Sequence, residues 1–192
     1  MQINIFILIL ALLSVSLTQG CAPVIVAGAA TGVSVANDRR TAGAVLEDQS
    51  IELKTVGIIQ SDKSLSNNSH ISVTSYNGIV LLTGQVPVAE IKNRIANETS
   101  KIEKVKRVHN ELKIANSTDF KTRSNDTWIT TKTKSTLLGA KGIESVHVKV
   151  ITEDGVVYLM GMVTREEANT IAKTVQQVKG VRGVIKVFEY LN

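Results

Sequence analysis

The chain has 192 residues, of which 43% are apolar and 20% charged, and its 22 Lys and Arg outnumber its 17 Asp and Glu to give a net charge of +5. This balance is ordinary for a folded protein and excludes a chain that is mainly disordered. One Cys and three His exclude both a disulfide framework and a multi-Cys metal site, and the length fits one domain of usual size or two small ones.

The first twenty residues carry no charged side chain and include an apolar run over 5–17. A membrane-spanning helix needs roughly 20 apolar residues, so this run is too short to cross a bilayer. It is instead typical of the apolar core of an export signal. We therefore expect residues 1–20 to be a signal peptide.

The only cysteine, Cys21, directly follows a small residue at the end of this segment. The sequence Leu17-Thr18-Gln19-Gly20-Cys21 resembles a bacterial lipobox, in which the Cys becomes the mature N-terminus and carries acyl chains such as palmitate. The alternative is a buried or free thiol near an ordinary cleavage site. Two or more acyl chains give stable anchoring where one is marginal, so the resemblance implies a protein that is anchored to a membrane without spanning it.

The residues behind the Cys bear on its destination. In lipoproteins of Gram-negative bacteria an Asp at this position commonly signals retention at the inner membrane, so Ala22 favours the outer membrane, with the protein on its periplasmic face. The chain up to Ala36 is small and apolar with several Gly, and Gly disfavours an isolated helix. We expect residues 21–47 to be a lipidated tether.

The remainder is a duplication with a period near 77 residues. Asn77-Gly78 aligns with Asp154-Gly155, and in both copies a second Gly follows the first after six residues. Asn-Gly and Asp-Gly between apolar runs are the strongest short signals for a β-hairpin, because the tight turn requires positive φ at both central residues. Each copy is therefore expected to contain a hairpin.

A helix and then a strand follow the hairpin in each copy. The helices are predicted over 87–102 and 165–178, where apolar residues recur with helical spacing, and the strands over 105–114 and 184–190, where they alternate. The helix starts are marked by a proline in the first turn and by a capping box, at Pro87 and at Thr164 with Glu167.

A helix also opens each copy, and we expect these helices to begin at Asp48 and Asp126. The order αββαβ, present twice, predicts an α+β fold of two tandem domains, each a small mixed three-stranded sheet packed against two helices. The predicted domains cover 48–114 and 126–192. The segment 115–125 between them is polar and rich in Ser, Asn and Thr, which is typical of a linker.

Both hairpins carry a pattern close to Gly-x-Val-x-Leu-x-Gly, at 78–84 and 155–161. With the αββαβ order, this pattern resembles the BON domain (bacterial OsmY and nodulation). A lipobox followed by two such domains is similar to the dual-BON outer-membrane lipoproteins, and the resemblance covers nearly the whole chain. It implies binding of anionic phospholipid such as phosphatidylglycerol, a role in envelope integrity near the division site, and neither catalysis nor a cofactor.

The two copies serve as controls for each other, because a residue that the fold requires should have an apolar counterpart in both. When Asp48 is aligned with Asp126, Trp128 falls on Ser50. At 100° per residue, Trp128 lies away from the face that carries Ile129. We therefore expect the only Trp to be exposed; the alternative is that it packs against the first domain or the linker.

Cationic and hydroxyl side chains lie near this Trp on the same predicted helix. An indole suits the headgroup region of a membrane, and each nearby Lys attracts anionic lipid by about 1 kcal/mol. We predict a lipid-binding site in the second domain that consists of Trp128, Thr131, Lys132, Lys134 and Ser135.

No catalytic constellation stands out. We interpret the histidines, in or beside predicted strands, and the paired acids, at a helix start and in a turn, as structural or surface residues. They are His70, His109, His147, Glu166 with Glu167, and Glu153 with Asp154. Each copy has nine basic and seven acidic residues, and no block of like charge marks a nucleic-acid face.

Two hypotheses of function follow. The first is a membrane-anchored module that binds anionic phospholipid through the opening helix of the second domain. The second is an interaction scaffold that contacts the outer-membrane protein assembly machinery or regulates cell-wall hydrolases. Vesicle binding by an acyl-free fragment distinguishes them.

Overall fold

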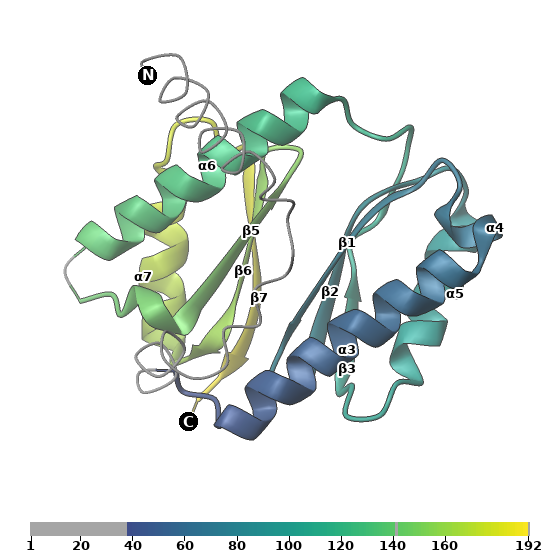
Figure 1. The fold of residues 1–192 in the computed structure, drawn as a ribbon. Coiled ribbons are helices and arrows are strands. Elements are labelled where there is room, and N and C mark those ends of the chain that lie inside the picture. Colours follow the sequence, from purple (N-terminus) through teal and green to yellow (C-terminus); the bar gives the residue numbers. More distant parts are fainter. Residues whose placement is uncertain (1–37, 141, 192) are drawn as a thin grey trace, which may run out of the picture. The chain divides into compact units, whose positions relative to one another are not determined.

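The computed structural model describes residues 38–140 and 142–191 (Figure 1). The expected signal peptide, the lipidation site at Cys21 and the tether as far as residue 37 lie outside these ranges. Within them, every helix is either too short or too polar to cross a bilayer.

The first repeat consists of α3 (Ala42–Ser61), α4 (Lys63–Ser66), β1 (His70–Tyr76), β2 (Ile79–Val86), α5 (Ala89–Ser100), β3 (Arg107–Asn110) and β4 (Lys113–Ile114). β1 pairs with β2 in antiparallel, and β3 and β4 pair with β2 in parallel. The parallel pairing follows from the crossover through α5. The strand predicted over 105–114 is thus shorter and broken in two.

The second repeat consists of α6 (Phe120–Gly139), the 3-10 turn η2 (Ser145–His147), β5 (Val148–Glu153), β6 (Val156–Val163), α7 (Arg165–Gln176) and β7 (Gly183–Tyr190). β6 pairs with β5 in antiparallel and with β7 in parallel. The predicted order αββαβ is confirmed in the second repeat and also in the first, where the short helix α4 is added and the last strand is divided. Each repeat builds a small mixed sheet with its helices on one face, and the sheet has the predicted three strands in the second repeat and four in the first (Figure 1).

The hairpin turns have the predicted conformation. Asn77 and Gly78 have φ of 51° and 77°, and Asp154 and Gly155 have φ of 48° and 71°. The glycine six residues further on has a separate cause. At Gly84, where φ is +117°, a Cβ atom would run into the main chain of the neighbouring strand β1, so only glycine fits.

The predicted starts of the opening helices are wrong. α3 begins at Ala42 and α6 at Phe120, each six residues earlier than expected. Their N-caps are Thr41 and Asp119, whose side chains accept a hydrogen bond from the backbone N–H of the third helical residue. The ends of the expected tether and linker are therefore helical.

The two aspartates that were expected to start these helices lie inside them and are buried. The carboxylate of Asp48 accepts hydrogen bonds from the N–H groups of Asn77 (2.7 Å) and Gly78 (2.9 Å). Asp126 accepts from both N–H groups of the equivalent turn, each at 2.8 Å. A buried carboxylate needs such partners, and each one fixes its helix to the hairpin turn.

The other helices begin close to the predicted positions. α5 begins at Ala89, because Val88 is extended and acts as the N-cap, so Pro87 lies just outside the helix. The capping box of α7 is confirmed: the Thr164 hydroxyl accepts from the Glu167 N–H, and the Glu167 carboxylate accepts from the Thr164 N–H.

Each repeat has its own apolar core between its sheet and its helices. Ile51, Leu65 and Ile95 are among the buried residues of the first, and Ile129 and Leu137 are among those of the second. A third cluster is shared by the two sheets and consists of Tyr76, Ile79, Leu81, Tyr158, Met160 and Val187. All three clusters lie within 38–191, so a fragment of residues 38–192 contains every core that the structure describes and is expected to fold on its own.

Two adjacent arginines at the start of the described chain connect the repeats. Arg39 donates to both carboxylate oxygens of Glu167, at 2.7 and 2.9 Å. Arg40 donates to Asp48 at 2.8 Å and stacks on the ring of Tyr76, 3.9 Å from its centroid. We call Arg39 and Arg40 the arginine clasp, because Arg39 holds the second repeat and Arg40 the first.

The clasp predicts a stability change in acid. Hydrogen bonds from Arg39 lower the pKa of Glu167 from 4.5 to about 2, against the opposing effect of burial. A group with a lowered pKa stabilises the fold above its unfolded pKa and loses that contribution as the pH falls toward its folded pKa. We expect the free energy of unfolding to drop between about pH 5 and pH 2 by at most about 3 kcal/mol from this pair, less after solvent screening.

The measurement is urea unfolding of residues 38–192 at a series of pH values, beside the variant Arg39→Gln. Other acids titrate in the same window, so the difference between the two proteins is the quantity of interest. It should shrink as the pH falls. A difference that stays constant from pH 6 to pH 2 would show that Glu167 is not stabilised by Arg39.

Candidate membrane-binding helix

Helix α6 is held on its sheet by one apolar and hydroxylated face. Ile129, Thr133 and Leu137 are buried on this face, as the helical spacing predicted. The Thr130 hydroxyl adds a hydrogen bond to the Thr152 hydroxyl of β5, at 2.7 Å. α6 therefore lies along β5 and beside α7, with its opposite face toward solvent (Figure 1).

The predicted exposure of Trp128 is confirmed, since half of its surface is accessible. One edge of the ring lies near Gly180, in the loop between α7 and β7 of the same repeat. The Lys132 ammonium lies 4.8 Å from the centroid of the ring, within the range of a cation–π interaction. The indole therefore has one edge against its own repeat and a cation near its ring.

The other predicted site residues share the solvent side of α6. Lys134, Ser135 and Thr131 are exposed and Lys132 is partly so. The Thr131 hydroxyl donates to the Thr127 carbonyl at 3.0 Å, so its proton is used within the helix. The structure thus brings the five predicted residues onto one side of one helix, with Trp128 and the two lysines as its most distinctive groups.

Two exposed apolar residues extend this surface beyond the prediction. Phe120 is 79% exposed and Leu138 is 75% exposed. They lie eighteen residues apart, which is five full turns, so they share one angular position along about 27 Å of helix, and Trp128 lies about 80° around from them. Three large apolar side chains therefore point away from the core along the length of α6.

Four cations flank this apolar row. At 100° per residue, Lys121 and Lys132 lie on one side of it and Arg123 and Lys134 on the other. None of the four forms an ion pair with a carboxylate within the part of the chain that the structure describes. We call the seven side chains the α6 face: Phe120, Lys121, Arg123, Trp128, Lys132, Lys134 and Leu138.

Sequence reasoning missed four members of this face. Phe120, Lys121 and Arg123 were assigned to the linker, because the helix was expected to begin at Asp126. The acidic Asp119 is a local signal that could have placed the start correctly, since Asp is a favoured N-cap. Leu138 lies inside the predicted helix but outside the predicted site.

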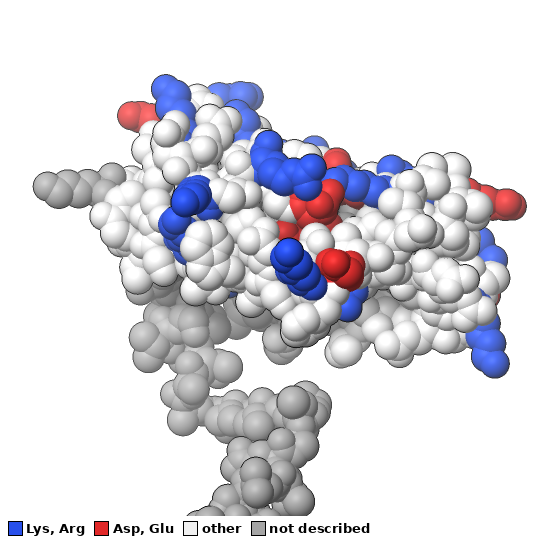
Figure 2. All heavy atoms as spheres, turned by 90° about the horizontal axis from the view of Figure 1, so that it is seen from above, with Lys and Arg blue, Asp and Glu red and all other residues white. Residues whose placement is uncertain are grey.

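The first repeat lacks this arrangement at its equivalent helix. α3 also exposes apolar side chains, with Leu46 and Leu53 at 66% and 74%. However, it contains one basic and three acidic residues, whereas α6 contains four basic and one acidic. Figure 2 views the molecule from above and shows basic side chains spread over the upper face, with acidic ones beside some of them. The distinguishing feature of α6 is therefore its charge.

The acids near the second hairpin turn serve the fold. Glu153 accepts a hydrogen bond from the buried amide of Gln85 at 2.6 Å. Asp154 pairs with Lys113 (3.0 Å) and Arg182 (2.8 Å), and the hydrogen bond from Lys113 lowers its pKa. Over residues 38–140 and 142–191, three or more His, Cys, Asp or Glu side chains nowhere gather in a way that could hold a metal ion.

Comparison with curated proteins finds relatives over most of the chain. The chain is 37% identical over 174 residues to "Outer membrane lipoprotein DolP" of Haemophilus influenzae, which covers 91% of this chain and 90% of the relative. It is 35% identical over 154 residues to the "21 kDa hemolysin" of Actinobacillus pleuropneumoniae, covering 80% and 79%.

A more distant relative and the family comparison agree with this result. The "Osmotically-inducible protein Y" of Escherichia coli is 29% identical over 161 residues, covering 81% of this chain and 80% of that protein. The BON domain model matches twice, at residues 47–116 and 125–192. The chain therefore belongs to the BON-domain family and contains two copies of the domain.

Proposed function

We propose that this chain is an outer-membrane lipoprotein on the periplasmic side, whose helix α6 binds anionic phospholipid of the phosphatidylglycerol type. The name of its relative DolP and the resemblance of the sequence at Cys21 to a lipobox support the anchor and the location. The observation that carries the binding role is the α6 face, which combines three exposed apolar side chains with four cations that have no carboxylate partner among the described residues. A role in envelope integrity, near the division site, is the expected consequence for the cell.

The physical basis is that of a helix lying in the plane of a membrane surface. Such helices insert an apolar side rich in Trp, Phe and Leu and carry Lys and Arg at its borders. The indole of Trp128 suits the headgroup level, because its ring is apolar and its N–H is polar. Each of the four cations adds about 1 kcal/mol of attraction to an anionic leaflet. The equivalent helix α3, with more acids than bases, would be repelled by the same leaflet.

The test is flotation of residues 38–192, which lack the lipidation site, with vesicles of zwitterionic lipid and with vesicles that also contain phosphatidylglycerol. Binding to the anionic vesicles alone supports the proposal. No flotation with either would leave the acyl anchor as the sole membrane contact and favour the second function, a scaffold for outer-membrane assembly proteins or cell-wall hydrolases.

Replacing Trp128 with Ala is expected to reduce vesicle binding by roughly 30-fold. Burying the exposed half of an indole contributes about 2 kcal/mol at ~25 cal/mol per Å². The matched control is Leu53→Ala, which removes an apolar side chain from α3 that is more exposed than Trp128, at 74% against 50%. Flotation with a graded content of phosphatidylglycerol gives both partition coefficients. Equal losses in the two variants would mean that the membrane does not contact α6 preferentially.

A further inference from the structure

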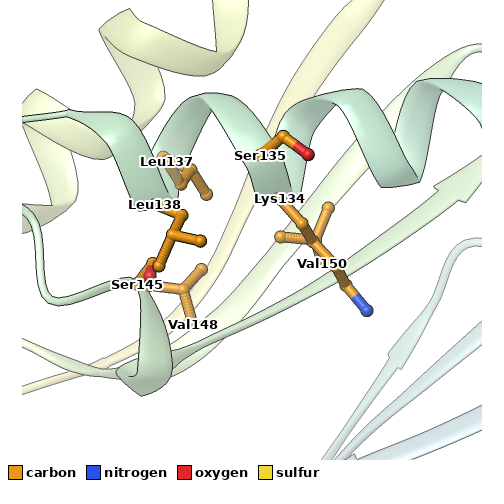
Figure 3. Close-up of a pocket in the computed structure, with 7 residues that line it drawn as sticks. All are labelled: Lys134, Ser135, Leu137, Leu138, Ser145, Val148 and Val150. Atoms are coloured by element: carbon orange, nitrogen blue, oxygen red, sulfur yellow. The ribbon is translucent and has the colours of Figure 1, made fainter.

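A pocket of about 270 Å³ lies beneath the C-terminal part of α6 (Figure 3). Its walls come from three segments of the second repeat: α6, the turn η2 and strand β5. The lining residues are Lys134, Ser135, Leu137, Leu138, Ser145, Val148 and Val150.

The interior of the pocket is apolar. Leu137, Val148 and Val150 are buried members of the core of the second repeat, and they point into the space between α6 and β5 in Figure 3. Among the described residues that line it, none is a carboxylate. An apolar cavity of about 150 Å³ is enough to hold benzene, so this pocket has room for a hydrocarbon segment.

The edge of the pocket differs from its interior. Leu138, which is 75% exposed, stands at the edge on α6. Lys134 lines the pocket with its aliphatic stem, and its ammonium points away from the two leucines (Figure 3). A long cationic side chain commonly covers apolar surface in this way while its charge stays in water. A hydrocarbon space with a cation at its border suits a ligand that has an apolar chain and an anionic head.

The first repeat shows that the fold does not require these residues. With Asp48 aligned on Asp126, Lys134 corresponds to Val56 and Leu138 to Gln60. The cation and the exposed leucine are thus both particular to the second repeat, as is the positive charge of α6.

We propose that this pocket takes a segment of one acyl chain of the phospholipid that α6 binds, with Lys134 against the phosphate. This inference rests on the proposed function. The source is a membrane phospholipid rather than the acyl chains expected at Cys21, because neither a diacylglyceryl group on the sulfur nor an amide-linked acyl chain carries a phosphate to pair with the ammonium. α6 would then do more than lie on the surface, since it would draw one chain out of the leaflet.

The experiment uses methyl NMR spectra of residues 38–192. The probes are monomeric dihexanoyl phosphatidylglycerol and glycerophosphoglycerol, which has the same head and no acyl chains. The acyl-bearing lipid should shift the methyl signals of Leu137, Val148 and Val150, while those of Val80, in the core of the first repeat, should stay in place. The head alone should shift none of them.

A pocket-filling variant gives the second measurement. Ser145→Phe places an aromatic ring in the space and should weaken dihexanoyl phosphatidylglycerol binding by about 50-fold, which corresponds to roughly three methylene groups at ~0.8 kcal/mol each. The matched control is Ser100→Phe, at an exposed position of α5. If circular dichroism shows that Ser145→Phe is unfolded, the variant Ser135→Phe takes its place, because it fills the same pocket from α6.

The outcomes separate this inference from the proposed function. Flotation on anionic vesicles without the methyl shifts would overturn the pocket and leave surface binding intact. Methyl shifts that persist in the pocket-filling variant would also overturn it. Methyl shifts that vanish in that variant support the pocket. If such shifts occur but the fragment does not float, the result supports the pocket and contradicts membrane binding by α6.

Discussion

Replacing Lys121, Arg123, Lys132 and Lys134 together with Gln is expected to lower the binding of residues 38–192 to phosphatidylglycerol vesicles by about 10³-fold. Each cation near an anionic surface contributes about 1 kcal/mol. None of the four has a carboxylate partner in the described structure, so lipid does not have to replace an existing ion pair. The apolar side chains of the α6 face remain in the variant. Residual binding should therefore lose its dependence on salt, which screens only the charges.

The control carries the same change of charge on the first repeat. It replaces four exposed lysines for which no ion pair is found in the described structure, at Lys54, Lys63, Lys104 and Lys106. Flotation at low and high salt gives the comparison. If this variant binds as weakly as the α6 variant, attraction depends on net charge alone, and α6 has no special role.

Replacing Asp126 with Ala is expected to lower the free energy of unfolding by about 3–5 kcal/mol. Its buried carboxylate accepts two hydrogen bonds of 2.8 Å from the turn at Asp154 and Gly155, and a hydrogen bond to a charged group contributes about 1.5–3 kcal/mol. The variant also leaves two turn N–H groups without acceptors. Urea unfolding followed by circular dichroism measures the loss.

The isosteric variant Asp126→Asn tests whether the charge or the shape of the side chain is responsible. Asn keeps one acceptor oxygen, so its loss should be smaller than that of Ala. The Asp126 side chain faces the core rather than the α6 face, so both variants should still float on anionic vesicles wherever they are folded. Midpoints equal to that of the parent protein would mean that the turn contacts do not stabilise the second repeat.

The parts of the fold that could be predicted are those encoded by neighbouring residues. The turn at Asn77-Gly78 needs positive φ at two adjacent positions, and Asn followed by Gly is the residue pair that favours this conformation. The helix starts predicted at Asp48 and Asp126 were wrong because Asp is a favoured N-cap. An Asp that caps a helix and an Asp that is buried inside one look the same in the local sequence. The true partners of Asp48 and Asp126 lie about thirty residues further on, in the hairpin turns, and no local pattern points to them.

The candidate site also has parts that could be predicted from the sequence and parts that could not. The exposure of Trp128 could be predicted because the first repeat supplies Ser50 at the aligned position. The charge difference between α3 and α6 could be predicted only in part, because the expected helix starts leave out Glu47 of α3 and Lys121 and Arg123 of α6. The pocket and the arginine clasp could not be predicted. The pocket depends on how η2 and β5 approach α6, and the clasp joins Arg39 to the carboxylate of Glu167, which lies 128 residues away in the sequence.

The apolar cluster shared by the two sheets limits the modularity of the chain. A duplicated gene begins as two interchangeable units, each able to exist without the other. Here Tyr76, Leu81, Tyr158 and Met160 are each at most 3% exposed, and they cover one another across the repeats. One repeat expressed alone would present this area to water, and sedimentation should show it associating with itself. The two copies have thus become mutually dependent, and recombination that exchanges one of them has to preserve the sheet surface of the other.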